Sequence, residues 1–338
     1  MINQLTVGTR GSKLAITQTE IVVTALRKEL PAVDFNVITI KTKGDIDKRP
    51  LFTIDRKGIF EKEINEAVIR SSIDFAVHSL KDIPSDLSND LTVASIPKRS
   101  KPYDVLVSPK KIKLKYLRSG SIIGTSSLRR AIQLMTLRPD LNIKPIRGNV
   151  ETRIAKAVRG DYDAIILAEA GLMRLGLEDM IAERFSLSDL TPAPGQGSLA
   201  VICRADNLEL IRLLKRIEDS RSRAEFEAEH ALLEKIEGGC RFPVGAIAVT
   251  GVNFIAKRSR IRPSNIRKKY RNTRDPRYLT LYASVFSADG TRNIKLRKRG
   301  NIKNARKLGL KMGKLLINGG ALDLASGWRE AVQKWNSL

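Results

Sequence analysis

The chain has 338 residues, of which 42% are hydrophobic and 29% are charged, a composition typical of a globular protein with two or three domains. No apolar run approaches the roughly 20 residues of a membrane span, and the N-terminus lacks the apolar stretch of a secretory signal. Two cysteines, Cys203 and Cys240, are too few for a disulfide framework or a four-cysteine zinc site. We therefore expect a reduced, cytoplasmic protein.

The formal net charge of +25 is distributed unevenly. Residues 251–338 hold 22 Lys and Arg against four acids, whereas the first 250 residues hold 39 against 32. Within the C-terminal part, residues 256–277 carry ten basic residues and one acid, without hydrophobic periodicity. We interpret this segment as a solvated insertion, and contact with nucleic acid or another polyanion is the alternative.

Strand-like and helix-like patterns alternate through the first 215 residues. The predicted strands are Leu5–Thr9, Phe35–Lys41, Phe75–Ser79, Val105–Ser108, Ile122–Gly124, Ile143–Ile146, Ala164–Ala168 and Leu199–Cys203. The predicted helices are Lys13–Leu30, Phe60–Ser71, Ser127–Leu137 and Val150–Val158. This alternation predicts parallel sheets that are covered by helices.

Two segments rich in Pro and Gly, Pro97–Tyr103 and Thr191–Gly197, divide this pattern and are expected to be linkers. They suggest that the middle block is inserted into the first. The expected domains are residues 1–98 with 198–217, residues 103–192, and an α+β unit of residues 220–338. The elements expected in the last unit are a helix at Arg221–Ile236, strands at Gly245–Phe254 and Tyr278–Ser287, a turn at Asp289 and Gly290, and a helix from Asn304.

Five arginines and one lysine stand against two acids between Thr125 and Arg153. The hydroxyl residues Thr125, Ser126 and Ser127 lead into the predicted helix, where exposed N–H groups and the helix dipole favour anions. The arginines that lie at strand ends and helix starts are Arg129, Arg130, Arg147 and Arg153. Each could be a solvated side chain, but together they indicate a shared site for carboxylates or phosphates.

Lys81 and Asp82 end a buried strand, where they form either a structural ion pair or a carboxylate site for proton transfer and charge stabilisation. His78 is interpreted as a core residue and His230 as a surface or interface residue, so we expect no metal site. Cys203 is expected in the core. Cys240 follows two glycines in a turn, and the residue pattern leaves it open whether this thiol is inert or reactive.

Eight segments of the chain resemble the porphobilinogen deaminase family in order and spacing. They are TRGSKLAITQ, KGIFEKE, AVHSLKDIP, IGTSSLRR, IRGNVETR, DAIILAEAGLMRLGL, PGQG and EGGCRFPVG. The resemblance implies two doubly wound α/β domains, similar to periplasmic binding proteins, with the active cleft between them. A smaller α+β C-terminal domain would follow, in a protein that is expected to be a monomer.

The resemblance also implies a reaction. Four porphobilinogen molecules would be condensed head to tail into the linear tetrapyrrole hydroxymethylbilane, with loss of ammonia. A dipyrromethane cofactor, joined to Cys240 through a thioether, would act as the primer. Asp82 would stabilise the azafulvenium cation and assist proton transfers, and cationic neighbours should keep it ionised.

The same resemblance implies which residues bind the cofactor and the growing chain. They are Arg10, Ser12, Lys57, Lys81, Thr125, Ser126, Ser127, Arg129, Arg130, Arg147, Gly148, Arg153, Arg174 and Gln196. Two departures from the family pattern are Phe52–Arg56, where relatives often have a lysine and paired glycines, and Lys43, where arginine is common. The competing hypotheses are an anion-binding protein without catalysis and a nucleic-acid-binding protein that uses the basic C-terminal unit.

Overall fold

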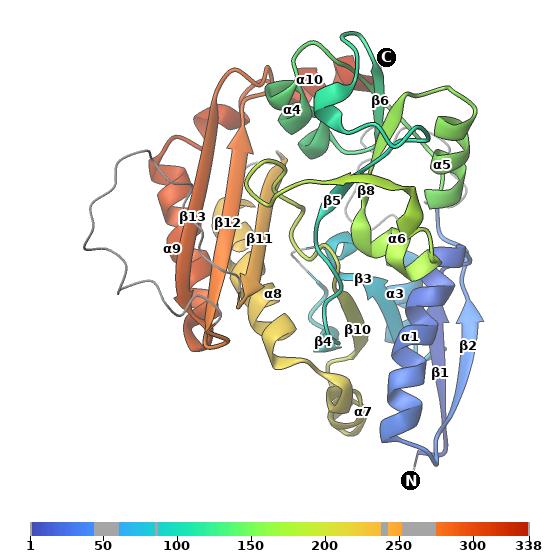
Figure 1. Ribbon diagram of the computed structural model, residues 1–338. Helices are drawn as coiled ribbons and strands as arrows, with labels where there is room; N and C mark the ends of the chain where they lie inside the picture. The colour runs from blue at the N-terminus through green and yellow to red at the C-terminus, as the bar shows by residue number, and fades with distance from the viewer. Residues whose placement is uncertain (1, 44–60, 85–86, 238–242, 252–274, 337–338) are drawn as a thin grey trace.

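Residues 2–43, 61–84, 87–237, 243–251 and 275–336 are described by a computed structural model. Three β-sheets organise these residues (Figure 1). The first sheet lies at the lower right of the figure, the second at the upper right and the third at the left. None of the described helices is long and apolar enough to cross a membrane.

The first sheet has five strands in the order β2-β1-β3-β10-β4. They are β1 (Gln4–Thr9), β2 (Asp34–Thr39), β3 (Phe75–Ser79), β4 (Leu91–Ser95) and β10 (Leu199–Arg204). Three helices belong to it: α1 (Lys13–Glu29), α3 (Lys62–Ile69) and α7 (Leu208–Leu214). Successive strand residues point to opposite faces, so Phe75 and Val77 pack with α1 and α7, whereas Ala76 packs with α3.

The second sheet repeats this arrangement in the order β7-β6-β8-β5-β9. Its strands are β5 (Asp104–Val107), β6 (Ile122–Thr125), β7 (Asn142–Pro145), β8 (Ala164–Ala168) and β9 (Ile181–Arg184). Its helices are α4 (Leu128–Leu137), α5 (Val150–Val158) and α6 (Glu169–Leu175). Each sheet therefore has three neighbouring parallel strands, followed by one strand that runs antiparallel to both of its neighbours.

The third sheet is antiparallel and consists of β11 (Val244–Thr250), β12 (Tyr278–Phe286) and β13 (Asn293–Asn301). Helices α8 (Ser220–Glu237) and α9 (Ala305–Asn318) bury their apolar residues against one face of this sheet. The last helix, α10 (Trp328–Asn336), contacts β7 of the second sheet instead. Short 3₁₀ helices are η1 (Leu80–Asp82), η2 (Leu114–Tyr116), η3 (Glu178–Met180), η4 (Lys215–Ile217), η5 (Ile302–Asn304) and η6 (Asp323–Ala325).

The prediction of parallel sheets is wrong for one strand in each sheet. β5 and β10 run antiparallel because each enters its sheet from the other unit, through a short linker at the opposite end. The turn at Asp289 and Gly290 is confirmed, since it joins the antiparallel strands β12 and β13. The elements that the pattern missed are β4, β9, β13, α6, α7 and α10. In β13, cationic side chains alternate with the inward-facing residues and lower the hydrophobic signal.

Both linkers between the first two sheets are fastened to α8 by one buried ion pair. Arg99 Nη1 lies 2.6 Å from Glu229 Oε1 and 3.4 Å from Glu225 Oε2. The Glu229 carboxylate also accepts hydrogen bonds from the backbone N–H groups of Gly195 at 2.6 Å and Ala248 at 2.7 Å. This pair therefore joins both linkers to the third sheet, where all three parts of the molecule meet.

Candidate active site

Charged residues gather at the carboxyl ends of β1 and β3, the edge at which open α/β sheets bind ligands. Arg10 follows β1, and Lys81 and Asp82 lie in η1 directly after β3. Since β1 and β3 are parallel neighbours, these ends meet at the same edge of the sheet. Ser12 begins α1 nearby, where its Oγ accepts a hydrogen bond from the N–H of Ala15 at 3.3 Å.

Lys81 and Asp82 are both exposed at this edge. Neither side chain forms a hydrogen bond or an ion pair with another described residue. Surrounding protein nevertheless desolvates the Lys81 ammonium group and lowers its pKa, although Asp82 opposes the shift and Arg130 adds to it. The Asp82 carboxylate is therefore available to a ligand, which the functional interpretation of this segment requires.

On the second sheet, one hydroxyl residue directly after β6 orients an arginine from α5. Ser126 Oγ accepts a hydrogen bond from Arg153 Nη1 at 2.8 Å, and Arg153 Nε donates to the Gly148 carbonyl at 2.7 Å. Thr125 is buried and its Oγ1 accepts from the N–H of Ser127 at 3.2 Å. Of the three hydroxyl residues, Ser126 therefore binds the Arg153 guanidinium, whereas Thr125 holds the backbone of Ser127 before α4.

The Arg153 guanidinium is surrounded mainly by protein and other cations. Burial lowers the pKa of Arg153 to about 10, with Arg130 and Arg147 adding to the shift and Asp82 opposing it. An added carboxylate would offset these neighbouring positive charges, so the position favours an anionic ligand.

Gly148 gives the backbone beside Arg153 a conformation that other residues rarely adopt. Its φ is +116°, and a Cβ added there would lie 2.6 Å from Thr152 Cγ2. The next residue, Asn149, begins α5 and accepts a hydrogen bond from the N–H of Thr152 at 2.8 Å. This tight turn sets the direction in which α5 presents Arg153.

Arg129 and Arg130 both bind the buried carboxylate of Asp104, at the start of β5. Arg129 Nη2 lies 2.9 Å from Asp104 Oδ2, and Arg130 Nη2 lies 2.7 Å from Oδ1. The Gln196 amide donates to the same Oδ1 at 2.8 Å. Burial alone would raise the pKa of Asp104, but the two guanidinium groups and these hydrogen bonds outweigh it and hold that pKa below its usual value.

The remaining donors of the two arginines are also used inside the protein. Arg129 Nη1 donates to the Thr191 carbonyl at 2.5 Å, and Arg130 Nη1 donates to the Ile166 carbonyl at 3.2 Å. Arg129 is only 6% exposed and Arg130 only 5%. The interpretation of these two as solvated side chains is therefore wrong, and in this structure they bind protein acceptors. The only sign of Asp104 in the sequence is an acid beside a predicted apolar strand.

The linker after β9 places Gln196 in the same region, and its backbone binds Arg174 of α6. Gln196 is buried and also donates to the Pro102 carbonyl at 2.8 Å. Arg174, in α6, donates to the Gly197 carbonyl at 2.8 Å, and burial lowers its pKa to about 10. At Gly195, where φ is +73°, an added Cβ would lie 2.8 Å from the backbone nitrogen of Lys81, so the linker lies directly against η1.

These contacts bring the two halves of the site together. The pKa of Lys81 responds to Arg129, Arg130 and Asp104 across the boundary between the sheets. Six predicted site residues are linked by such electrostatic effects on the pKa of Lys81 or Arg153. They are Lys81, Asp82, Arg129, Arg130, Arg147 and Arg153. Arg10 is electrostatically joined to His78 on β3. Predicted Lys57 and Cys240 lie outside the described residues, as do Phe52–Arg56.

The surroundings of the two histidines and of Cys203 are those of structural residues. His78 is 6% exposed, and burial together with the Arg10 charge lowers its pKa to about 4. His230 Nδ1 lies 3.0 Å from Glu234 Oε1 on the same helix. Cys203 is fully buried in β10, as expected, and burial raises the pKa of its thiol to about 12. Within the described part of the chain, no group of three or more His, Cys, Asp or Glu side chains could hold a metal ion.

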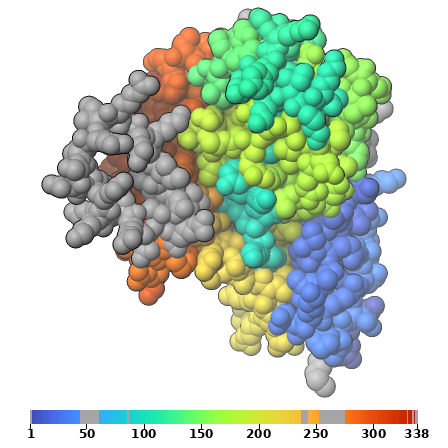
Figure 2. All heavy atoms as spheres, in the orientation of Figure 1, coloured from blue at the N-terminus to red at the C-terminus, as the bar shows by residue number. Residues whose placement is uncertain are grey.

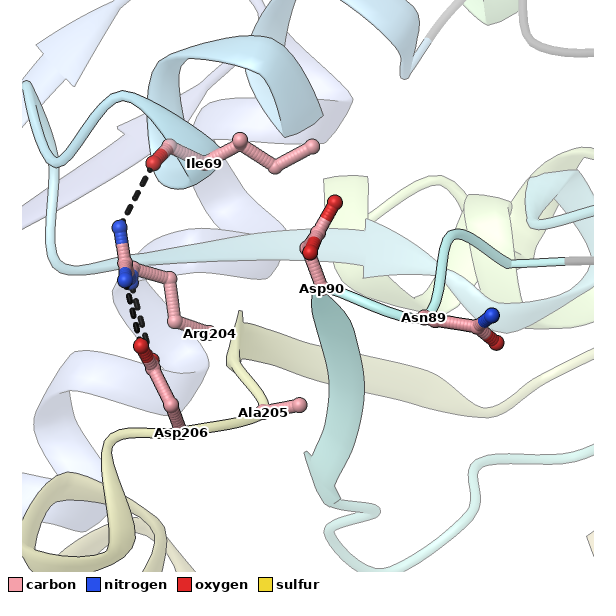
Figure 3. Close-up of a pocket in the computed structure, with 6 residues that line it drawn as sticks. All are labelled: Ile69, Asn89, Asp90, Arg204, Ala205 and Asp206. Atoms are coloured by element: carbon pink, nitrogen blue, oxygen red, sulfur yellow. Dashed lines mark hydrogen bonds and ion pairs between the residues drawn. The ribbon is translucent and has the colours of Figure 1, made fainter.

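A small surface pocket of about 160 Å³ lies elsewhere (Figure 3). Its lining includes Asn89, Asp90, Arg204 and Asp206. Arg204 already donates to Asp206 and to the Ile69 carbonyl, as the dashed lines show. β10 is antiparallel to β3, so its end at Arg204 lies at the sheet edge opposite Asp82. This pocket is therefore separate from the candidate active site.

Family models match most of the chain. The model for the porphobilinogen deaminase dipyromethane cofactor binding domain matches residues 5–212. The model for the porphobilinogen deaminase C-terminal domain matches residues 223–318. The first match contains both halves of the candidate active site.

Relatives share much of the sequence over nearly the same length. The chain is 47% identical over 330 residues to a probable porphobilinogen deaminase of Nitrosopumilus maritimus, covering 98% of each chain. It is 42% identical over 323 residues to the porphobilinogen deaminase of Desulforamulus reducens, covering 95% of this chain and 96% of the relative.

Solved structures with little sequence similarity show a weak likeness of fold. The methionine-binding protein MetQ matches with a TM-score of 0.42 and 14% identity, covering 64% of this chain and 89% of that one. The family models and the sequence relatives, in contrast, agree with each other over almost the whole length. The chain therefore belongs to the porphobilinogen deaminase family.

Proposed function

We propose that the chain condenses four porphobilinogen molecules head to tail into hydroxymethylbilane, with release of ammonia. The observation that supports this most directly is the exposed carboxylate of Asp82 beside Lys81, at an edge where Arg153 from the other sheet lies within electrostatic reach. An anion-binding site needs the cations only. A reaction that passes through a positively charged substrate also needs the carboxylate.

The cations of the site suit the substrate. Each porphobilinogen carries an acetate and a propionate, so each condensation adds two carboxylates to the growing chain. Arg153 is already oriented by Ser126 and by the Gly148 carbonyl, and Lys81 supplies a second cation at the other side of the site. We propose that these two groups, with Arg10, Arg147 and Arg174, bind substrate carboxylates. Arg129 and Arg130 add positive potential, while Asp104 holds them in place.

The proposed role of Asp82 is to stabilise positive charge and to move protons. The carbon–nitrogen bond of the aminomethyl group breaks, and ammonia leaves with the bonding electrons. The cationic carbon that remains forms a bond to the unsubstituted carbon of the acceptor pyrrole, which then loses its proton. A carboxylate beside this carbon lowers the energy of the cation and can accept that proton.

The residues present also fit a dipyrromethane, since the chemistry of the donor set (several cations around one carboxylate) matches a group that bears acetate and propionate side chains. When bound, this group supplies the acceptor pyrrole for the first condensation. We propose that it is attached through a thioether at Cys240. Cys203 is unsuited, because it is fully buried within β10 and its thiol has a raised pKa.

Intact-mass measurement of the purified protein tests this proposal. The expected mass exceeds that of the 37.6 kDa chain by one dipyrromethane, and acidic Ehrlich reagent should colour the protein. Cys240→Ser should lack the thioether-linked group, with Cys203→Ser as the matched control that keeps it. If neither added mass nor colour is present, and porphobilinogen restores neither, the proposed reaction is wrong and the anion-binding hypothesis takes its place.

Three further expectations belong to this proposal. The domain boundaries (residues 1–98 with 198–217, 103–192 and 220–338) are supported by the presence of one sheet in each. A cytoplasmic location and a monomeric state are also expected, and light scattering at the mass of one chain would test the latter.

Nucleic-acid contact by residues 256–277 stays the less favoured hypothesis, and most of that segment lies outside the described residues. Salt-dependent binding in a low-salt shift assay would support it.

A further inference from the structure

The C-terminal segment, residues 320–336, runs from the core of the third sheet, where Ala321 and Leu324 pack, to α4 of the second sheet. The C-terminal family model ends at residue 318, so this segment follows the part of the chain that the model matches. In Figure 1, α10 lies beside α4 at the top of the molecule, away from α8 and α9. Figure 2 shows orange atoms of the third sheet beside green atoms of the second sheet's unit in the same upper region. The segment thus connects two parts of the molecule whose sequences lie far apart.

Trp328 makes the central contact. Its side chain is 4% exposed and packs in one cluster with Phe286 of β12 and Ile132 of α4. Its indole Nε1 donates a hydrogen bond to the Phe286 carbonyl at 3.0 Å, so the ring is fixed in orientation as well as buried. Trp328 therefore links α4 to the end of β12 through both apolar contact and a directed bond.

Trp335 anchors the other end of α10. It is 7% exposed and lies in the core of the second sheet, in the cluster that contains Leu134 of α4 and Ile143 of β7. The turn between β12 and β13 adds a third contact, because a Cβ added to Gly290 would lie 3.0 Å from Ile132 Cδ1. Elements from the C-terminal part of the chain thus hold α4 from several sides.

The two faces of α4 have different partners. Leu128 and Ile132, four residues apart, lie on the face that meets Trp328. Arg129 and Gln133 have the same spacing on the neighbouring face, where Arg129 binds Asp104 and both bind the Thr191 carbonyl. Since a short helix moves as a unit, any shift at Ile132 would also displace the guanidinium groups that lie next to it in sequence.

We propose that the C-terminal segment positions α4, with Trp328 as the positioning residue, so that Arg129 and Arg130 stay aligned with Asp104 at the substrate-binding site. The inference rests on the proposed function for its effect on catalysis. Its structural part, that Trp328 restrains α4, does not depend on the reaction. The alternative is that Trp328 only adds stability, without influence on the site.

Steady-state kinetics of the full chain separate these alternatives. Trp328→Ala should raise the KM for porphobilinogen about five-fold and change kcat by less than about two-fold, because ground-state binding is weakened. Trp328→Phe, which keeps the ring contact, should restore most of the wild-type KM. Met312→Ala is the matched control, since Met312 is fully buried in the core of the third sheet and should leave KM unchanged. A wild-type KM in Trp328→Ala would overturn the proposal.

Amide hydrogen exchange of α4 provides a readout that needs no turnover. In Trp328→Ala, the amides of α4 should exchange about ten-fold faster, whereas Met312→Ala should leave them unchanged. A raised KM with unaltered exchange in α4 would also overturn the proposal, since the effect would then reach the site by another route. If Trp328→Ala does not fold, Ile132→Val takes the same measurements with smaller expected effects. Failure of wild-type turnover would refute the proposed function and leave the exchange result decisive.

Discussion

Two aspartates that both raise the pKa of Lys81 have opposite surroundings. Asp82 is exposed in η1, and no described residue donates a hydrogen bond to it. Asp104 is fully buried and accepts hydrogen bonds from Arg129, Arg130 and Gln196. The first carboxylate is open to a ligand, and the second has its hydrogen-bonding capacity filled by protein groups.

The difference shows why both kinds of group occur in one site. A buried charge is tolerated only when it is paired and hydrogen-bonded, and it then fixes the geometry of its partners. An exposed charge fixes little but can respond to charge that develops on a substrate. We infer that Asp104 sets the shape of the cationic half of the site, whereas Asp82 performs the chemistry.

The largest expected effect tests the role of Asp82. Asp82→Ala should lower turnover by about 10³-fold or more, or about 4 kcal/mol of activation free energy, because the carboxylate that stabilises the cation is lost. The free energy of unfolding should change by less than about 0.5 kcal/mol, as for other exposed positions. Porphobilinogen consumption and urea denaturation measure the two quantities. Asp34→Ala, at another exposed acid of the first sheet, is the control, and near-normal turnover in Asp82→Ala would remove Asp82 from its role.

Asp104→Asn, unlike Asp82→Ala, should strongly lower the free energy of unfolding. Removal of one buried charge leaves two buried guanidinium groups without their counterion, so the free energy of unfolding should fall by about 3–4 kcal/mol. Urea denaturation provides the measurement. Asp206→Asn breaks a mostly exposed pair with Arg204 and should cost about 1 kcal/mol or less. Equal losses of unfolding free energy in the two variants would contradict the conclusion that burial makes the Asp104 carboxylate a structural charge.

His78 tests how burial changes the pKa of a histidine. Burial and the Arg10 cation lower its pKa from 6.5 to about 4. Below pH 6.5 the unfolded chain takes up a proton that the folded protein does not, so stability should fall by up to about 3 kcal/mol as the pH drops from 6.5 to 4. Above pH 6.5 both states are neutral and His78 contributes no pH dependence. His78→Leu should flatten this part of the unfolding profile measured by urea at each pH, and an unaltered acid slope would contradict the assignment.

The smallest expected effect concerns Arg153. Arg153→Lys keeps the positive charge but loses the donors to Gly148 and Ser126 that orient the side chain. We expect the KM for porphobilinogen to rise about five-fold, equivalent to about 1 kcal/mol, with little change in stability. Arg159→Lys, in an exposed ion pair with Asp161 just after α5, should leave KM unchanged. An unchanged KM in Arg153→Lys would show that its fixed geometry is unimportant for binding.

Most of the strands and helices of the first two sheets could be predicted from periodicity, because each buries one or both faces. The strand Phe75–Ser79 and the helix Val150–Val158 occur as predicted. The direction of β5 and β10 could not be predicted, since it depends on the side from which a linker enters the sheet. α10 was also missed, because its buried tryptophans face a sheet that is distant in sequence.

Short motifs such as AVHSLKDIP and IRGNVETR were enough to identify residues that gather at the ends of the strands. Asp82 and Arg153 could be selected in this way, because local pattern places them directly after a strand or within the first turn of a helix. The groups that Arg129 and Arg130 bind depend instead on how distant parts of the chain fold together. Their partner Asp104 is about 25 residues away along the chain and Gln196 more than 60, and a buried ion pair between such positions leaves no periodic signal.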